Sequence, residues 1–156
     1  LTARGPTLLE YNCRMGDPET QVVLPLLADA TPLFDVMLAC CEGRLAAQPV
    51  EWSDKSAATV VMAAAGYPGA YAKGAPIRGV ADAAALDGVT VYHAGTKWEG
   101  DGLVSSGGRV LAVTGVGATL ADAVAKAYAG VAKITFDGGA PAHFRKDIAA
   151  KASVGA

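Results

Sequence analysis

Short strand-like segments separated by turn residues fill the chain from residue 60 onward, and this pattern constrains the fold more than any other feature. Five segments carry the apolar and β-branched residues typical of strands: Val60–Ala65, Ile77–Val80, Val89–His93, Leu103–Ser105 and Arg109–Thr114. Turn signals such as Asp87-Gly88 and Gly107-Gly108 stand between them. We therefore expect a small β-rich domain in this part of the chain.

One main helix is expected after these strands. Thr119-Leu120-Ala121-Asp122 resembles a capping box, in which a hydroxyl before the helix accepts a hydrogen bond from a backbone N–H of the first turn. The following residues repeat apolar side chains at helical spacing: Ala123, Val124, Ala127, Tyr128 and Val131. A last short strand is expected at residues 134–136.

The N-terminal part of the chain begins with a predicted strand. Between residues 7 and 15 apolar and polar residues alternate, so one face carries Leu9, Tyr11, Cys13 and Met15. The other face carries Glu10, Asn12 and Arg14. This arrangement would project three polar side chains toward the same side.

Two helices are expected after this strand. Asp17 has the chemistry of a helix N-cap and Pro18 that of a first helical residue, and this helix should run to about Leu27. A second helix should begin at residues 31–32 and stop at Gly43. Its apolar residues are expected to be buried: Leu33, Phe34, Met37, Leu38 and Cys41.

A polar segment at residues 45–56, which contains Pro49, separates the two patterns. We expect residues 1–48 to form the end of one domain and residues 49–156 to form a second, β-rich domain with one main helix. The predicted fold class is α+β.

Composition limits the class of protein. The chain has 156 residues, 52% of them hydrophobic and 18% charged, so it can bury an ordinary core. A net charge of −2 gives no electrostatic basis for binding nucleic acid or an anionic membrane. No apolar run approaches the roughly 18 residues needed to span a bilayer. The chain begins without methionine, and a fragment or a processed product is expected.

Cysteine and histidine usage indicates a reducing compartment. The three cysteines, Cys13, Cys40 and Cys41, form an odd number without C-x-x-C spacing, which argues against a disulfide framework. Only two histidines are present, so a zinc cluster is not expected. We predict a cytoplasmic location, with the lumen of a reducing organelle left open, and expect Cys40 and Cys41 to be core thiols.

The strongest candidate site is the polar face of the first strand and the helix start after it. Glu10 and Asn12 offer hard oxygen ligands suited to Mg²⁺ held jointly with nucleotide phosphates. Arg14 offers planar, permanently charged donors for a phosphate. The other interpretation is a solvated strand face followed by a well-capped helix, and periodicity alone leaves both open.

Other polar residues allow two interpretations each. His93 ends an apolar strand and fits a structural role as well as a site. Arg109 follows a Gly-Gly turn and would either start a strand or contact a phosphate. Arg145 and Lys146 would reach a ribose phosphate across a domain interface or form a solvated charged end.

Five ordered sequence blocks resemble the glycinamide ribonucleotide synthetase family of ATP-grasp ligases. Residues 9–21 read LEYNCRMGDPETQ, similar to the family signature E-[FY]-N-x-R-F-G-D-P-E-x-Q. VVMA with GYPG, then HAGT, then GGRVLAVT follow in the family's order, at residues 60–69, 93–96 and 107–114. A closing FRKDI at residues 144–148 is similar to Y-R-[RK]-D-I-G.

The resemblance implies a fold and a set of site residues. The first 48 residues would be the end of an ATP-grasp domain, a strand plus two helices, followed by the family's C-terminal domain. Glu10 and Asn12 would hold Mg²⁺ or Mn²⁺ against ATP. Arg14 would meet phosphate charge and Asp17 would orient the substrate or contact its amine. Arg109, Arg145 and Lys146 are further candidate substrate contacts.

The resemblance also implies a reaction. Transfer of the γ-phosphoryl group of ATP to the carboxylate of glycine gives an acyl phosphate, which the amine of 5-phosphoribosylamine attacks. The products are glycinamide ribonucleotide, ADP and phosphate. The N-terminal part of the family's enzyme is missing, so this piece alone should not catalyse the reaction. Fusion to other purine-pathway domains is left open.

Three positions depart from the family pattern: Met15 replaces Phe, Phe144 replaces Tyr, and Ala149 stands where the family usually has Gly. Met15 is tolerable if the position only packs apolar atoms. Phe144 loses a hydroxyl group. Ala149 puts in doubt any positive φ or close backbone approach at that position.

Two rival hypotheses remain. Gly115-Val116-Gly117, a helix and Asp137 imitate a dinucleotide-binding fingerprint, although Leu120 stands at the third glycine position. The second rival is a truncated, non-catalytic homologue that serves as a binding or scaffold module; the intact set of Glu10, Asn12, Arg14 and Asp17 argues against it.

Overall fold

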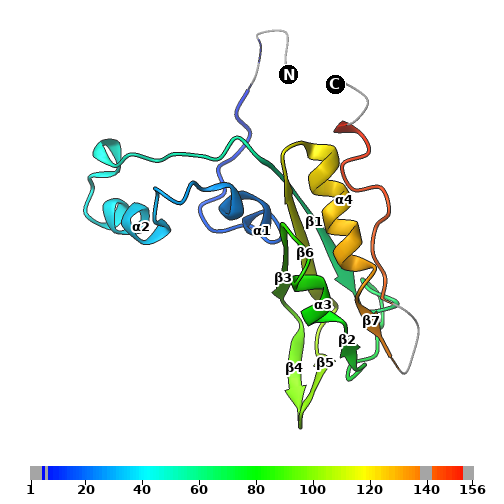
Figure 1. Ribbon diagram of the computed structural model, residues 1–156. Helices are drawn as coiled ribbons and strands as arrows, with labels where there is room; N and C mark the ends of the chain where they lie inside the picture. The colour runs from blue at the N-terminus through cyan, green and yellow to red at the C-terminus, as the bar shows by residue number, and fades with distance from the viewer. Residues whose placement is uncertain (1–4, 6, 138–141, 153–156) are drawn as a thin grey trace.

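A three-stranded antiparallel sheet forms the centre of the computed structural model, which describes residue 5, residues 7–137 and residues 142–152. Strand β6 (Arg109–Gly117) lies between β1 (Ser56–Ala63) and β3 (Val89–His93), and helix α4 (Leu120–Val131) packs on the sheet (Figure 1). The largest fully buried side chains belong to β1, β5 and β6: Met62, Leu111, Val60, Val110, Val113, Thr114 and Ser105. The mixed α and β content agrees with the predicted class.

Helix α4 begins where its capping pattern predicts. The side chain of Thr119 accepts a hydrogen bond from the backbone N–H of Asp122, with 3.2 Å between the heavy atoms. Close packing against β6 requires glycine, because a Cβ atom built on Gly115 would overlap the carbonyl oxygen of Ala123. The prediction of one main capped helix is confirmed.

The dinucleotide-binding hypothesis is wrong. Gly115 and Gly117 lie inside β6 rather than in a turn after it. β6 runs antiparallel to both β1 and β3, whereas the dinucleotide fold needs parallel strands joined by crossover helices. The two glycines serve helix packing, because a Cβ on Gly117 would also meet the α4 residues Asp122 and Ala123.

Two small ladders extend the β content. β2 (Ile77–Arg78) pairs with β7 (Thr135–Phe136), and β4 (Thr96–Glu99) pairs with β5 (Gly102–Ser105) as a hairpin. A short helix, α3 (Val80–Ala84), precedes β3.

Several predicted boundaries needed correction. The strand predicted at 77–80 ends at Arg78, because Gly79 has a φ of 80° and starts a turn into α3. The hairpin strand β4 was not predicted, since Lys97, Trp98 and Glu99 are all exposed and leave no apolar alternation. The strand predicted at 89–93 is confirmed residue for residue.

The predicted N-terminal strand is absent from the described residues. Residues 7–15 are exposed throughout and form no ladder with any described segment, and a strand without a pairing partner leaves its backbone groups to water. The first helix is also shorter than predicted: α1 (Thr20–Val23) continues as the 3₁₀ turn η1 (Leu24–Leu26), and its N-cap is Glu19. Asp17 is therefore not a helix cap.

Helix α2 (Leu33–Cys41) forms as predicted and ends before Gly43, whose φ is 68°. Its predicted burial is wrong, because Ala39 is its one buried residue and the side chain of Phe34 is 72% exposed. α2 and the 3₁₀ turn η2 (Leu45–Ala47) project away from the sheet (Figure 1). Within the described chain, no helix has the length and apolar character needed to cross a bilayer.

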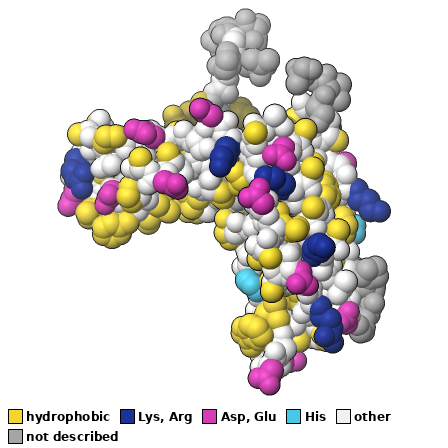
Figure 2. All heavy atoms as spheres, viewed as in Figure 1, with side chains coloured by type: hydrophobic (Ala, Val, Ile, Leu, Met, Phe, Trp, Pro, Cys, Tyr) yellow, Lys and Arg dark blue, Asp and Glu magenta, His cyan; other side chains and the backbone are white. Residues whose placement is uncertain are grey.

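Cys40 and Cys41 are exposed on this projecting arm, so the prediction of core thiols is also wrong. Figure 2 shows hydrophobic side chains gathered along the lower edge of the arm. The helical period of α2 predicts an apolar face correctly, but nothing in the described structure covers that face.

Candidate functional site

The turn that carries Asp17 is seated on the first residue of β6. Nη2 of Arg109 lies 2.7 Å from Oδ2 of Asp17, and Nη1 of Arg109 donates to the main-chain oxygen of Asp17 at 3.1 Å. Nε2 of Gln21 donates to the other carboxylate oxygen of Asp17 at 3.2 Å. Both oxygens of this carboxylate are thus held, which fixes its orientation at the surface of the sheet.

A buried pair of hydroxyl groups forms a second anchor for the same segment. Oγ1 of Thr114 lies 3.0 Å from the main-chain oxygen of Gln21 and 2.8 Å from Oγ1 of Thr59. The carbonyl can only accept, so Thr114 donates to it and Thr59 donates to Thr114. Thr114 and Thr59 are buried, where such bonds are shielded from water.

The side-chain amide of Gln21 leaves one acceptor unused. Its Oε1 atom is buried and has no hydrogen-bond partner among the described residues. A buried acceptor without a donor costs about 1–3 kcal/mol. The orientation that places Nε2 on Asp17 thus stabilises the Asp17 carboxylate at the expense of this acceptor.

The loop that contains Gly95 packs against the loop that precedes Arg109. The main-chain oxygen of Gly95 accepts hydrogen bonds from Ser106 at 2.7 Å and from Gly107 at 3.2 Å. A Cβ atom on Gly95 would lie 2.6 Å from the main-chain oxygen of Arg109, so only glycine allows the loops to meet. His93 lies at one end of this arrangement, with Nδ1 3.1 Å from Oγ1 of Thr96.

An open hollow of ≈ 440 Å³ lies between the Asp17 turn and the end of β3. Residues from both sides line it: Met15, Gly16, Asp17, Thr20, Gln21, Leu24, Tyr92 and His93. Burial raises the pKa of the Tyr92 hydroxyl above its usual range. The hollow therefore offers one fixed carboxylate, one phenol and one imidazole to a small polar ligand.

The predicted metal ligands lie in the extended segment before this turn. Glu10 and Asn12 are exposed, and no hydrogen bond or ion pair engages their side chains in the described structure. Arg14 donates from Nη1 to the main-chain oxygen of Met15 at 3.2 Å. Accessible, unpartnered carboxylate and amide oxygens fit Mg²⁺, which usually takes one or two protein ligands and completes its shell with phosphates and water.

The donor set of this chain is nevertheless partial. No group of three or more His, Cys, Asp or Glu side chains with metal-binding geometry occurs within the part of the chain that is described. Two protein oxygens from Glu10 and Asn12 would need phosphate oxygens to hold the ion. This is the arrangement that Mg²⁺ adopts with nucleotides.

Arg145 and Lys146 lie elsewhere. Arg145 forms a two-bond pair with Asp147, at 2.9 Å from Nε to Oδ1 and 2.7 Å from Nη2 to Oδ2. This hydrogen bonding raises the pKa of Arg145 and lowers that of Asp147. Lys146 is exposed, and neither basic residue forms a hydrogen bond or ion pair with the Asp17–Arg109 cluster. The structure does not bring these basic residues to the candidate site.

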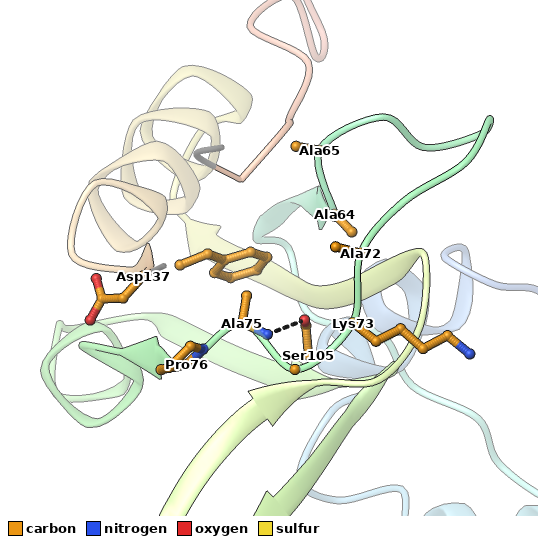
Figure 3. Close-up of a pocket in the computed structure, with 10 residues that line it drawn as sticks. Ala64, Ala65, Ala72, Lys73, Ala75, Pro76, Ser105 and Asp137 are labelled. Atoms are coloured by element: carbon orange, nitrogen blue, oxygen red, sulfur yellow. Dashed lines mark hydrogen bonds between the residues drawn. The ribbon is translucent and has the colours of Figure 1, made fainter. Parts of the chain in front are cut away.

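A second hollow, of ≈ 240 Å³, lies beside β5 and does not gather a reactive set (Figure 3). Oγ of buried Ser105 accepts a hydrogen bond from the backbone of Ala75 at 3.1 Å. Lys73 and Asp137 point away from each other, and Asp137 is paired with Arg78. Ser105 and Asp137 are thus engaged by neighbouring residues, and Lys73 points away from Asp137.

Sequence reasoning missed Gln21, Thr59 and Thr114 at the site. The two threonines stand in the middle of apolar strands, where a buried hydroxyl needs a partner, and this is a usable signal. Gln21 sits in the signature block but carried no separate indication of its role.

Comparison with known proteins decides the family. The family model described as "Phosphoribosylglycinamide synthetase, C domain" matches residues 57–151. The chain belongs to this family. It therefore corresponds to the C-terminal part of phosphoribosylamine–glycine ligases, as the five sequence blocks predict.

Curated single-enzyme relatives are about three times as long as the chain. It is 52% identical over 146 residues to "Phosphoribosylamine--glycine ligase" of Synechocystis sp., an alignment that covers 93% of this chain and 33% of that protein. It is 48% identical to the "Bifunctional purine biosynthetic protein purD" of Dictyostelium discoideum, over 93% of this chain and 17% of that protein. The chain thus spans about a third of the length of its single-enzyme relatives.

A solved structure has the same fold. The crystal structure of phosphoribosylamine–glycine ligase from Thermotoga maritima matches with a TM-score of 0.72 and 36% sequence identity. The match covers 91% of this chain and 33% of that structure. Residues before 57, which carry Glu10, Asn12 and Asp17, lie outside the family's C-domain match.

Proposed function

We propose that this chain supplies one third of an ATP-dependent ligase that joins glycine to 5-phosphoribosylamine. The observation that carries the proposal is a contact between two of the sequence blocks that resemble the family. Asp17 of the first block pairs with Arg109 of the block at residues 107–114, 92 residues further along the chain. This contact joins the turn that carries Asp17 to strand β6, and an active site assembled from both parts would need such a contact.

The reaction assigned to the complete enzyme has two steps. The γ-phosphoryl group of ATP passes to the carboxylate of glycine, giving glycyl phosphate and ADP. The amine of phosphoribosylamine then attacks the acyl carbon, releasing phosphate and forming glycinamide ribonucleotide. Neither step needs a protein nucleophile, so the enzyme acts by positioning its substrates and balancing their charge.

Glu10 and Asn12 are the residues of this chain that would hold Mg²⁺ or Mn²⁺. The bound ion would neutralise phosphate charge during transfer. Arg14 is assigned to the phosphate oxygens, since its guanidinium has donors to spare beyond its bond to Met15. Asp17 is assigned to the amine or the orientation of the substrate, because its carboxylate lines the hollow in a fixed orientation.

Residues 1–48 are proposed to complete an ATP-grasp domain, and residues 49–156 to form the C domain. Support comes from the apolar surface of the first region, where Leu9 is 93% exposed and Phe34 72% exposed. Contiguous exposed apolar surface marks a protein interface. The remainder of the ligase, which the aligned residues do not span, would cover this surface and bring the adenine and triphosphate sites.

Partners follow from the same assignment. The substrates are glycine, phosphoribosylamine and ATP, and the necessary macromolecular partner is the rest of the ligase. The bifunctional relative supports fusion to another purine-pathway domain as one form of the protein. A cytoplasmic location is proposed, where these soluble substrates occur, and this chain alone is proposed to be inactive.

A chimeric enzyme tests the proposal. This chain would replace the matching third of the Synechocystis sp. ligase, and ADP release would be measured with glycine, with phosphoribosylamine, with both and with neither. We expect release that depends on both substrates and on Mg²⁺. A folded chimera that lacks this dependence would contradict the ligase assignment and favour a non-catalytic binding module.

A further inference from the structure

Strand β6 contains an extra residue near its start. Met62 of β1 lies opposite Leu111, and the next residue, Ala63, lies opposite Arg109, so Val110 has no partner in β1. An extra residue of this kind is a β-bulge, which changes the face toward which the neighbouring side chains point.

The bulge explains the direction of the Arg109 side chain. Side chains alternate between the two faces of a strand. Thr114 faces the segment that contains Gln21, whereas Val113 faces α4, since a Cβ on Gly130 would lie 2.7 Å from its Cγ1 atom. Uninterrupted alternation would put Arg109 on the same face as Val113.

Arg109 instead contacts Asp17, on the face of Thr114. The insertion of Val110, which is fully buried, therefore turns the guanidinium toward the signature turn. β-Bulges recur next to active sites because they re-aim a side chain in this way.

We propose that Arg109 is a positioning residue, aimed by the bulge at Val110, through which the C domain sets the orientation of Asp17. This inference rests on the proposed function and names the C-domain group that organises its site. Arg109 thus acts on Asp17, in place of the direct phosphate contact considered from the sequence.

The geometry of the Arg109–Asp17 pair fixes the orientation of Asp17 but should contribute little to the stability of the fold. One nitrogen of Arg109 binds the carboxylate of Asp17 and another binds its main-chain oxygen, so side chain and backbone are fixed together. A lysine ammonium cannot reproduce this planar fork. The side chains remain 40% and 55% exposed, and exposed pairs add little to folding stability. Loss of the pair should therefore appear in turnover rather than in melting temperature.

Variants of the chimera test this role: Arg109→Met, Arg109→Lys, Asp17→Asn and the double variant Arg109→Met with Asp17→Asn. We expect Arg109→Met to lower kcat on the order of 100-fold, with the KM for ATP unchanged, because misplacement of a site group by about 1 Å has such an effect. Arg109→Lys should recover part of the loss. Arg78→Met is the matched control, since Arg78 forms an exposed pair with Asp137.

The double variant separates positioning from direct substrate binding. If Arg109 acts through Asp17, the double variant is no slower than Asp17→Asn alone. Multiplied losses, together with a raised KM for phosphoribosylamine in Arg109→Met, would show a direct phosphate contact and overturn the inference. Activity of Arg109→Met equal to that of Arg78→Met would also overturn it.

Hydrogen exchange on this chain tests the inference without turnover. The amides of Thr20 and Val23 donate to the main-chain oxygens of Gly16 and Glu19, at 3.1 Å and 3.0 Å. Both should exchange faster in Arg109→Met than in Arg78→Met. An inactive wild-type chimera would count against the proposed function alone, and unchanged exchange in Arg109→Met would then overturn the positioning role.

Discussion

The C-domain region buries or half-buries most of its large apolar side chains, whereas the region before it leaves most of its own exposed. Residues 57–151 contain every buried hydrophobic residue of the core except Ala39. Among the described residues, thirteen large hydrophobic side chains are exposed, and eleven of them lie between residues 8 and 52. The C domain therefore has a core of its own, whereas the described residues before it leave most of their large apolar side chains uncovered.

This difference matters for the site because the proposed chemistry sits in the poorly packed region. Glu10, Asn12, Arg14 and Asp17 precede residue 52, and of these four Asp17 alone forms a hydrogen bond or ion pair with the C domain in the described structure. The C domain thus holds the end of this segment that carries Asp17. Site residues are often carried on segments that a folded scaffold positions.

The largest expected effect is a difference in unfolding free energy between truncation of a core side chain in the C domain and truncation of an exposed side chain in the region before it. Leu111→Ala removes a fully buried side chain and should lower the free energy of unfolding by about 2–5 kcal/mol. Phe34→Ala should change it by less than about 0.5 kcal/mol in this chain. Urea denaturation of both variants measures the contrast. Equal losses would mean that α2 already has a packed partner.

Glu10→Gln separates activity from stability. In the chimera it should lower metal-dependent turnover on the order of 100-fold, or about 2.7 kcal/mol of transition-state stabilisation, because a charged ligand is lost. Melting temperature should not change, since Glu10 is exposed and unpaired among the described residues. Glu42→Gln, on the same region and paired with Arg44, is the control and should keep full activity. Full activity of Glu10→Gln at limiting Mg²⁺ would remove Glu10 from the site.

Gly115→Ala tests the tight packing of the C domain. The added methyl group would overlap the carbonyl oxygen of Ala123, so we expect a loss of about 1–3 kcal/mol in unfolding free energy. Gly102→Ala is the matched control, because its added Cβ would meet the nearest atom at 3.5 Å. Thermal unfolding of the two variants should differ clearly, and similar melting temperatures would show that α4 can shift away from β6.

Thr119→Ala should cost about 1 kcal/mol, because it removes the cap of α4. Asp17→Ala should not show a capping loss, since Asp17 lies outside α1 and its N-cap is Glu19. Chemical denaturation of the two variants compares a real cap with one that sequence pattern alone predicted. A larger loss for Asp17→Ala than for Thr119→Ala would restore the capping role.

The smallest effect concerns the pair of Asp147 and Arg145. The hydrogen bond from Arg145 lowers the pKa of Asp147 in the folded chain, so the pair stabilises the fold above the unfolded carboxyl pKa. That contribution is lost as pH falls through the lower folded pKa. Melting curves of Asp147→Asn and the unmodified chain should differ slightly at about pH 6. They should converge as the pH falls below the lowered pKa of Asp147 in the folded chain. A difference that grows on acidification would contradict the assignment.

The sequence predicts local features of the fold well and contacts at long range poorly. The strand at Val89–His93 and the cap at Thr119 follow from residue pattern alone, because each depends on neighbours along the chain. The strand expected at residues 7–15 fails because pairing requires a partner that pattern does not supply. The same limit hid the burial of α2, whose apolar face is real but uncovered.

The site shows the same division. Asp17 and Arg109 were both singled out from the sequence, but their contact spans 92 residues and depends on a bulge that no local signal announces. Thr59 and Thr114 needed the register of β1 and β6 before their hydroxyl groups could be paired. Family resemblance supplied roles for Glu10 and Asn12 that residue pattern left open.

Product analysis of the chimera tests the central claim most directly. With ¹³C-labelled glycine, phosphoribosylamine, ATP and Mg²⁺, mass spectrometry should detect labelled glycinamide ribonucleotide in amounts equal to the ADP released. The Glu10→Gln chimera should make far less of it under the same conditions. A well-folded chimera that hydrolyses ATP without forming this product, or forms none with either protein, would contradict the account.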